Sequence, residues 1–198
     1  MDKLTVSDLL TLEEYARQRA SFRKEIMQHK RNRQLPLGRR ARLLFENRRT
    51  VHYQIQEMLR IEKIFEPDGI DEELAAYNPL IPDGTNLKAT LMLEYPDPEE
   101  RKVALAKLHG VENRVWLQVE GDKKVYPICD EDLERDNGEK TSSVHFLRFE
   151  LTSSMITAMK QETLLKAGID HEEMLIEVDV HPEIRQSLTD DLDTPSLN

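Results

Sequence analysis

Apolar residues in the first part of the chain recur at the spacing of a helix. Between residues 12 and 33 they fall three, seven and four positions apart, which places them on one helical face. They are Leu12, Tyr15, Phe22 and Ile26. Thr11 followed by Glu14 fits a capping box at the start of this helix. The pattern also predicts a second helix over residues 48–65 and a short third helix over residues 71–77.

After residue 86 the helical spacing changes to the alternation that is typical of strands. Residues 87–95 alternate apolar and polar side chains, which indicates a half-buried strand. Residues 142–151 are apolar on both faces and are therefore expected to form a central strand. Thr152 is predicted to cap a helix that closes at Gly168, and residues 174–180 are predicted to form a last strand.

This order of elements, helices first and then strands with helices between them, predicts an α+β fold. We expect a single, mostly antiparallel sheet with helices packed on it. The 198 residues suffice for one hydrophobic core, so we expect one domain over residues 1–182. Residues 1–38 of this domain should form an N-terminal helical arm, made of a basic helix and its connector. Residues 183–198 are expected to form an acidic C-terminal tail.

The charges are segregated along the chain, although the formal net charge is -10. Residues 17–49 contain twelve Arg or Lys and two acidic residues, whereas residues 50–198 contain fifteen basic and thirty-two acidic ones. Such asymmetry indicates an interaction surface. The cations on either side of Pro36 are expected to face water and to bind an acidic protein partner. These are Arg31, Arg33, Arg39 and Arg40.

Nucleic-acid binding through the same basic segment is a less favoured alternative. Clustered cations attract phosphates, but aromatic residues are sparse among them, so platforms for base stacking are not evident. The overall negative charge also opposes binding to a polyanion. A solvated helix face that pairs with the acidic remainder of the same chain is a further interpretation of the segment.

Composition and motifs exclude several classes of protein. The chain has one cysteine, Cys129, and six histidines of which no two fall at metal-ligand spacing. It contains no glycine-rich phosphate loop and no nucleophile elbow. No stretch approaches the roughly 20 apolar residues of a membrane span, and no signal peptide is evident. We therefore expect a cytoplasmic protein that contacts no membrane and carries no metal or cofactor of its own.

A second candidate site combines the helix of residues 48–65 with the later strands. A helical projection places Glu62 near the centre of the apolar face, where a carboxylate must be paired, hydrogen-bonded or protonated. Arg148, a cation within an apolar strand, is its expected partner. A buried structural ion pair is favoured over a ligand pocket. If a pocket forms, it should be built from Glu57, Arg60, Glu62, Lys88, His145 and Arg148.

Four phrases of the chain resemble DUF3501, an uncharacterised bacterial family. They are QEMLRIE at residues 56–62, YNPLIPDG at 77–84, KATLMLEYP at 88–96 and EKTSSVHFLRFEL at 139–151. The resemblance spans roughly residues 1–168 and implies no assigned activity. Genes of this family often neighbour genes for rubrerythrin and for an iron–sulfur oxidoreductase subunit. That association implies a partner of a redox system, but it carries no mechanism.

The function favoured at this point is a non-catalytic one. The chain is interpreted as an accessory protein of a bacterial redox system, which binds an acidic partner whose cofactors lie on other chains. One alternative is a small-ligand-binding protein or an enzyme with a Glu/Arg/His pocket, and another is a nucleic-acid binder. A cleft lined by the pocket residues would favour the small-ligand alternative, whereas a flat basic face would favour the accessory protein.

Overall fold

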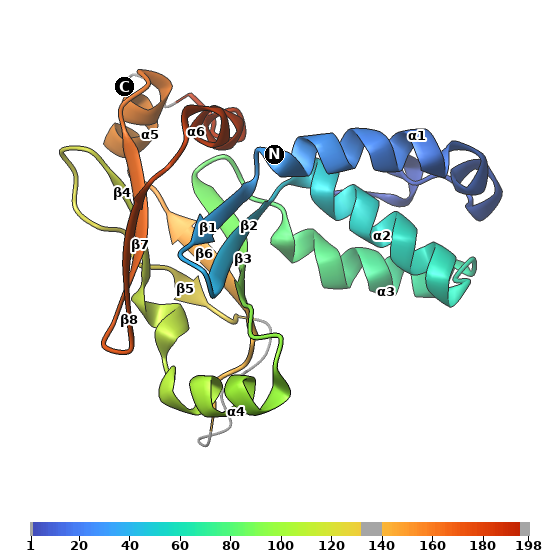
Figure 1. The fold of residues 1–198 in the computed structure, drawn as a ribbon. Coiled ribbons are helices and arrows are strands. Elements are labelled where there is room, and N and C mark those ends of the chain that lie inside the picture. The colour runs from blue at the N-terminus through green and yellow to red at the C-terminus, as the bar shows by residue number, and fades with distance from the viewer. Residues whose placement is uncertain (1, 132–139, 195–198) are drawn as a thin grey trace.

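The structure, a computed structural model, describes residues 2–131 and 140–194 (Figure 1). In this part of the chain, a helical arm lies beside a body that contains two antiparallel sheets. The arm contains α1 (Leu12–Arg31), α2 (Arg48–Glu62) and α3 (Pro67–Tyr77), with short 3-10 turns η1 (Val6–Asp8) and η2 (Asn78–Leu80). The α+β class is therefore confirmed.

Helix α1 begins at the cap that the sequence predicts, whereas α3 begins at Pro67, four residues before the expected residue 71. Thr11 and Glu14 form the capping box of α1, and the side chain of Asn47 accepts hydrogen bonds from the first turn of α2. The arm has a small apolar core of its own, formed by Leu4, Val51, Ile55, Leu59, Leu74 and Ile81. Because α2 and α3 supply this core, the arm is larger than the expected residues 1–38.

The larger sheet has the strand order β1-β2-β3-β6-β5, and every neighbouring pair is antiparallel. Its strands are β1 (Gln34–Leu37), β2 (Ala41–Glu46), β3 (Asn86–Leu93), β5 (Ile128–Cys129) and β6 (Val144–Glu150). Alternate residues of β2, β3 and β6 are fully buried, as the period of two in a strand requires. The other face of these strands is half-buried and looks toward the arm.

A smaller sheet, with the order β4-β7-β8, replaces the single sheet that we expected. Its strands are β4 (Val115–Val119), β7 (Leu165–His171) and β8 (Met174–Asp179). Gly168 does not close a helix, because it lies inside β7 opposite Trp116. A Cβ at Gly168 would overlap the Trp116 ring and the carbonyl oxygen of Ile176, so only glycine fits. Buried residues of both sheets form one main core.

The remaining helices are η3 (Val111–Arg114), α4 (Pro98–Lys107), α5 (Ser153–Lys160) and α6 (Pro182–Thr189). The first part of the expected acidic tail is therefore a helix, and Asp191 and Leu192 beyond it are buried. Asp191 pairs with the buried Arg33, and Leu192 packs into the main core. These contacts explain why residues 183–192 are ordered against the body. None of the helices in the described ranges is long and apolar enough to cross a membrane.

Candidate functional site

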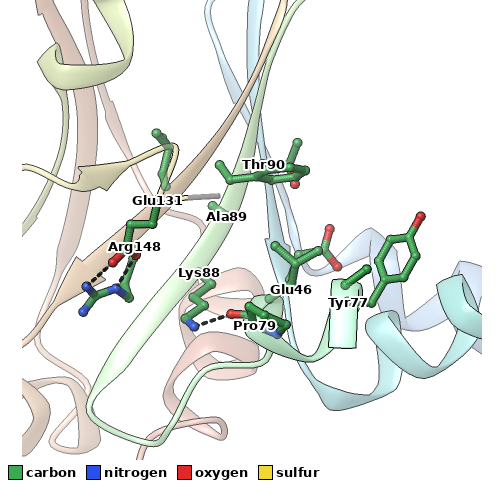
Figure 2. Close-up of a pocket in the computed structure, with 12 residues that line it drawn as sticks. Glu46, Tyr77, Pro79, Lys88, Ala89, Thr90, Glu131 and Arg148 are labelled. Atoms are coloured by element: carbon green, nitrogen blue, oxygen red, sulfur yellow. Dashed lines mark hydrogen bonds and ion pairs between the residues drawn. The ribbon is translucent and has the colours of Figure 1, made fainter. Parts of the chain in front are cut away.

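A cleft of about 420 Å³ lies between the half-buried face of the larger sheet and the end of α3 (Figure 2). Strands β2, β3 and β6 form its floor, and α3 with the following turn η2 forms its wall. The side chains that line this cleft include Glu46, Tyr77, Leu80, Lys88, Phe146 and Arg148. Glu131, which follows β5, closes one side.

The strand register brings the charged residues of the floor to one level of the sheet. Glu46 of β2 is the partner of Lys88 in β3, and Lys88 is the partner of Arg148 in β6. Directly opposite residues of an antiparallel pair have Cβ atoms about 4.5–5.5 Å apart, so their side chains interact. Two of the residues expected in a pocket, Lys88 and Arg148, therefore do meet.

Arg148 is held by carboxylates on both of its edges. Its Nε and Nη2 each donate to Glu131 over 2.7 Å, and its Nη1 donates to Glu150. The hydrogen bonds from Arg148 lower the pKa of the Glu131 carboxyl below its ordinary value, and the same bonds raise the pKa of the guanidinium. The charge of Arg148 is thus balanced within the protein.

Lys88 lies in a different electrostatic situation. Its Nζ donates to the carbonyl oxygen of Pro79, as Figure 2 shows, and no carboxylate of the described residues lies within 4.0 Å of it. Burial lowers the pKa of Lys88 from its ordinary 10.5, and the positive charges of Lys3 and Arg148 lower it further. Within the described part of the chain, the ammonium therefore has no carboxylate in ion-pair range, although the charges of Glu131 and Asp83 act on it from farther away and raise its pKa.

The wall of the cleft is apolar, in contrast to its floor. Tyr77 and Leu80 of the arm line the cleft together with Phe146, the half-buried residue two positions before Arg148 in β6. Thr90 lies beside Phe146, since these two residues are register partners. A cleft with an apolar wall and a few polar groups is typical of small-molecule sites. Sequence reasoning missed this wall, although alternation in β6 places residues 146 and 148 on one face.

His145 does not belong to this cleft, contrary to expectation. It neighbours Phe146 in β6 and therefore points to the opposite face, where it is fully buried. Its Nδ1 lies 2.6 Å from Asp130, and its Nε2 lies 2.9 Å from the hydroxyl of Thr141 and 3.0 Å from the carbonyl oxygen of Ser142. His145 is thus a core histidine whose ring nitrogens are satisfied by the protein.

The expected pair of Glu62 and Arg148 is also absent from the structure. Glu62 is exposed at the end of α2, whereas Arg148 pairs with Glu131 and Glu150. The helical projection fails because the last turn of α2 extends past its neighbours, so that Ile61 is 62% exposed. Within α2 the buried polar residues are Thr50 and Gln56, and the amide of Gln56 bonds both backbone groups of Leu10.

The other two expected pocket residues of α2 also lie outside the cleft. Arg60 is exposed. Glu57 accepts hydrogen bonds from the hydroxyl of Tyr15 and from Nε and Nη2 of Arg19, all at 2.7 Å. These bonds, the one from Arg19 above all, lower the pKa of Glu57 to about 2. Glu57 therefore joins α2 to α1.

The expected partner-binding cations occupy three different environments. Arg33 is 1% exposed and pairs with Asp191, so it cannot meet a partner. Arg40 pairs with Glu100 and lies over the ring of Tyr95. Arg31 and Arg39 are exposed as expected. Among the described residues, half of the twelve cations at positions 17–49 form ion pairs within the chain. They are Arg17, Arg19, Arg33, Arg40, Arg42 and Arg48.

The structure also bears on metal and thiol chemistry. In residues 2–131 and 140–194, no group of three or more His, Cys, Asp or Glu side chains is arranged to hold a metal ion. Burial raises the pKa of the Cys129 thiol to about 12, and the nearby negative charge of Glu112 adds to this effect. The thiol is therefore protonated at neutral pH, which disfavours a nucleophilic role.

Comparisons with known proteins place the chain in a family. The model of DUF3501, described as a protein of unknown function, matches residues 3–192, so the likeness extends through α6 and beyond the expected residue 168. A crystal structure titled as a novel protein of unknown function from Burkholderia pseudomallei has 50% sequence identity and a TM-score of 0.92. The match covers 97% of this chain and 100% of that one. No curated protein matches. The chain belongs to the DUF3501 family of proteins of unknown function.

Proposed function

We propose that this protein binds a small molecule in the cleft between the larger sheet and the end of α3. The observation that carries the proposal is the ammonium of Lys88, which faces an open cavity with no carboxylate of the described residues in ion-pair range. Removing a charge from water without pairing it has a free-energy cost. A ligand that compensates this cost would bind where the protein has left the charge unpaired.

The chemistry of the cleft supports binding rather than catalysis. His145, a residue of the alternative pocket, lies on the other face of the sheet. Two carboxylates of the described residues line the cleft. Glu46 accepts a hydrogen bond from the hydroxyl of Thr50, and Glu131 accepts hydrogen bonds from Arg148. A general base must reach the proton that it removes, and both carboxylates already hold hydrogen-bond partners. The floor therefore supplies charge and shape more readily than proton transfer.

Thermal denaturation with a library of small anions and neutral molecules tests this proposal. A ligand that binds only the folded state raises the melting temperature. We expect such ligands to act on the wild type and to lose their effect in Lys88→Met. Lys166→Met is the matched control, since Lys166 is also a half-buried strand lysine but pairs with Glu177 in the smaller sheet. Equal responses of the two variants would contradict a site at Lys88.

Association with an acidic protein partner is a second candidate function. Its support is a set of exposed α1 cations that have no carboxylate of the described residues within 4.0 Å, namely Arg23, Lys24 and Arg31. A redox protein is the partner class that the family resemblance implies. Because charge complementarity acts mainly on encounter and specificity, capture should weaken as salt rises past about 0.15 M.

Charge reversal tests this second candidate. The triple variant Arg23→Glu, Lys24→Glu, Arg31→Glu should lose a partner that copurifies with the wild-type protein from its native cell. The control is Lys102→Glu, Lys107→Glu, Lys123→Glu, which changes the net charge equally at exposed positions outside α1. Equal loss in both variants would assign the effect to total charge and would contradict a docking site on α1.

A further inference from the structure

We infer that the ligand of the cleft is an amphiphilic monocarboxylate, a molecule with one carboxylate and an apolar body, and that its carboxylate binds Lys88. This inference rests on the proposed binding function and specifies the class of ligand. It follows from the balance of charges on the floor, from the free donors of the lysine and from the apolar wall.

The floor carries two cations and three carboxylates, and Lys88 is the cation for which no carboxylate of the described residues lies in ion-pair range. Arg148 is neutralised by Glu131 and Glu150, which together occupy both edges of its guanidinium. Glu46 stands directly across from Lys88 on the neighbouring strand and adds a negative charge to the floor. A single carboxylate can pair with Lys88, but a phosphate dianion would bring a second negative charge toward Glu46 and Glu131. Like charges at such short range disfavour binding.

A second lysine near the cleft does not change this balance. Lys3 lies close enough to Lys88 to lower the pKa of the latter. Its ammonium, however, donates to the carbonyl oxygens of Asn78 and Ile81, at 2.8 and 3.1 Å, and the charge of Asp83 opposes its own. Lys3 therefore contributes to the local potential, while Lys88, unlike Lys3, lines the cleft.

The remaining donors of Lys88 are suited to a carboxylate. An ammonium has three N–H donors and no acceptor, and only one donor is needed for the carbonyl oxygen of Pro79. Two donors can thus turn toward the cavity without loss of the existing bond. The bond to Pro79, a residue of η2, also ties the floor of the cleft to its wall, so the ammonium is held in place before a ligand arrives.

The shape of the cavity accounts for the apolar body. Its volume of about 420 Å³ falls in the usual range for small-molecule sites, which is roughly 300–1,000 Å³. Beyond Lys88 the cavity is bounded by Phe146 on the sheet and by Tyr77 and Leu80 on the arm. Burial of apolar ligand surface there contributes about 25 cal/mol for each Å² removed from water. A small polar anion such as acetate or phosphate would leave this wall unused.

Calorimetric titration with probes that share one apolar chain separates these contributions. The probes are octanoate, octyl phosphate, octanol and octylamine, and 3-phenylpropanoate adds an aromatic body. We expect octanoate or 3-phenylpropanoate to bind the wild type at least about tenfold more tightly than octanol, because one charge-assisted hydrogen bond exceeds 1.4 kcal/mol. The tighter of the two acids distinguishes an aliphatic source, such as a fatty acid, from an aromatic one.

Two variants tie the result to Lys88 and to the cleft. In Lys88→Met the affinity for octanoate should fall to that for octanol, while Lys166→Met should bind as the wild type does. Ala76→Trp, which places an indole on the exposed α3 residue that lines the cleft, should abolish binding of every probe. Unfolding midpoints close to that of the wild type establish that these variants are folded.

A gain of affinity in a Glu131 variant is a result that a purely structural role of Glu131 would not produce. Glu131→Gln releases one edge of Arg148 and removes a negative charge from the floor. The affinity for octyl phosphate should then rise several-fold relative to that for octanoate, because two cations face the ligand. An unchanged ratio of the two affinities would contradict the charge balance on which the inference depends.

The outcomes separate the inference from the proposed function. If octanol or octyl phosphate binds as tightly as octanoate, and NMR signals of Tyr77 and Phe146 shift, the cleft is a binding site but its ligand is not a monocarboxylate. If no probe shifts these signals, both the inference and the proposed function fail. Binding of octanoate that survives in Ala76→Trp would place it outside the cleft and would also overturn the inference.

Discussion

Arg33, which directly precedes β1, and Arg148 of β6 both lie at the larger sheet, but the protein satisfies their donors in different ways. Arg33 is 1% exposed, and three of its bonds go to the backbone carbonyl oxygens of Phe45, Glu46 and Ser187. Among the described residues, Arg148 is bound by the side chains of two carboxylates, which are themselves about half exposed. Backbone acceptors are fixed by the fold, whereas exposed side chains can move aside.

This difference separates a cation that stabilises the fold from a cation that can pair with a ligand. The carboxylate of Asp191 completes a set of acceptors around Arg33 that no ligand can enter, because the site is closed. At the cleft the acceptors are side chains at the edge of a cavity, and the neighbouring Lys88 has no carboxylate partner among the described residues. We infer that the first arrangement stabilises the fold, whereas the second leaves an ammonium with which a ligand can pair.

The largest effect is expected where the closed arrangement is broken. Asp191→Ala leaves the guanidinium of Arg33 buried without a carboxylate, which should reduce the free energy of unfolding by about 3–5 kcal/mol. Asp190→Ala is the control, because the exposed Asp190 accepts only from the side chain of Gln186, and it should cost less than about 1 kcal/mol. Chemical denaturation measures both. Similar midpoints would show that Asp191 does not differ from a surface acid.

An intermediate effect is expected for the half-buried pair within the arm. Glu57→Gln removes the charge that accepts from Tyr15 and Arg19, and this should cost about 1–3 kcal/mol at neutral pH. The pair joins two helices but remains partly open to water, so its contribution should fall between those of Asp191 and the cleft. Urea denaturation of the variant against the wild type measures the difference.

The pH dependence of this pair has a defined sign. The folded pKa of Glu57 is about 2, below its ordinary 4.5, so the ionised form stabilises the folded state. That contribution is complete above about pH 4.5 and is lost as the pH falls toward about 2. The stability difference between the wild type and Glu57→Gln should therefore shrink across this window. A difference that stays constant from pH 6 to pH 3 would contradict the assignment.

The smallest effect on stability is expected in the cleft. Lys88→Met removes a partly desolvated ammonium and one bond to a carbonyl oxygen, and these two changes oppose each other. We expect the free energy of unfolding to change by less than about 1 kcal/mol. A loss as large as that of Asp191→Ala would show that Lys88 is a structural cation, and the contrast with Arg33 would disappear. Guanidinium denaturation of both variants in parallel decides the point.

Sequence patterns located the strands of the cleft better than its contents. The alternation at residues 87–95 and the apolar run at residues 142–151 correspond closely to β3 (Asn86–Leu93) and β6 (Val144–Glu150). Alternation also separates His145 from Arg148, a consequence that the pocket hypothesis did not apply. Lys88 and Arg148 lie opposite each other because of the register between two strands that are far apart in the chain. Local sequence patterns do not specify that register.

Two errors have definite physical causes. Gly168 has the position of a helix cap in the sequence, but in the structure its missing side chain lets the Trp116 ring pack against β7. The sequence therefore predicts a helix where β7 lies, and it does not predict the second sheet. The predicted apolar face of α2 continues through Glu62, but in the structure it ends at the buried Leu59, and Ile61 and Glu62 beyond it are exposed. A glycine and a helix end both depend on tertiary neighbours, which a single helical pattern does not specify.

The pairing of Arg33 with Asp191 also has a consequence for the order of folding. The two residues are 158 positions apart, and contacts across such a separation form late because the intervening chain must first be closed into a loop. At about 5–20 residues per second, the arm leaves the ribosome many seconds before Asp191 does. During that interval the guanidinium of Arg33 lacks its carboxylate, so closure of the body around it is less favourable by about 3–5 kcal/mol. Until Asp191 is synthesised, the nascent chain is therefore more exposed to the chaperones and proteases that act on incomplete folds.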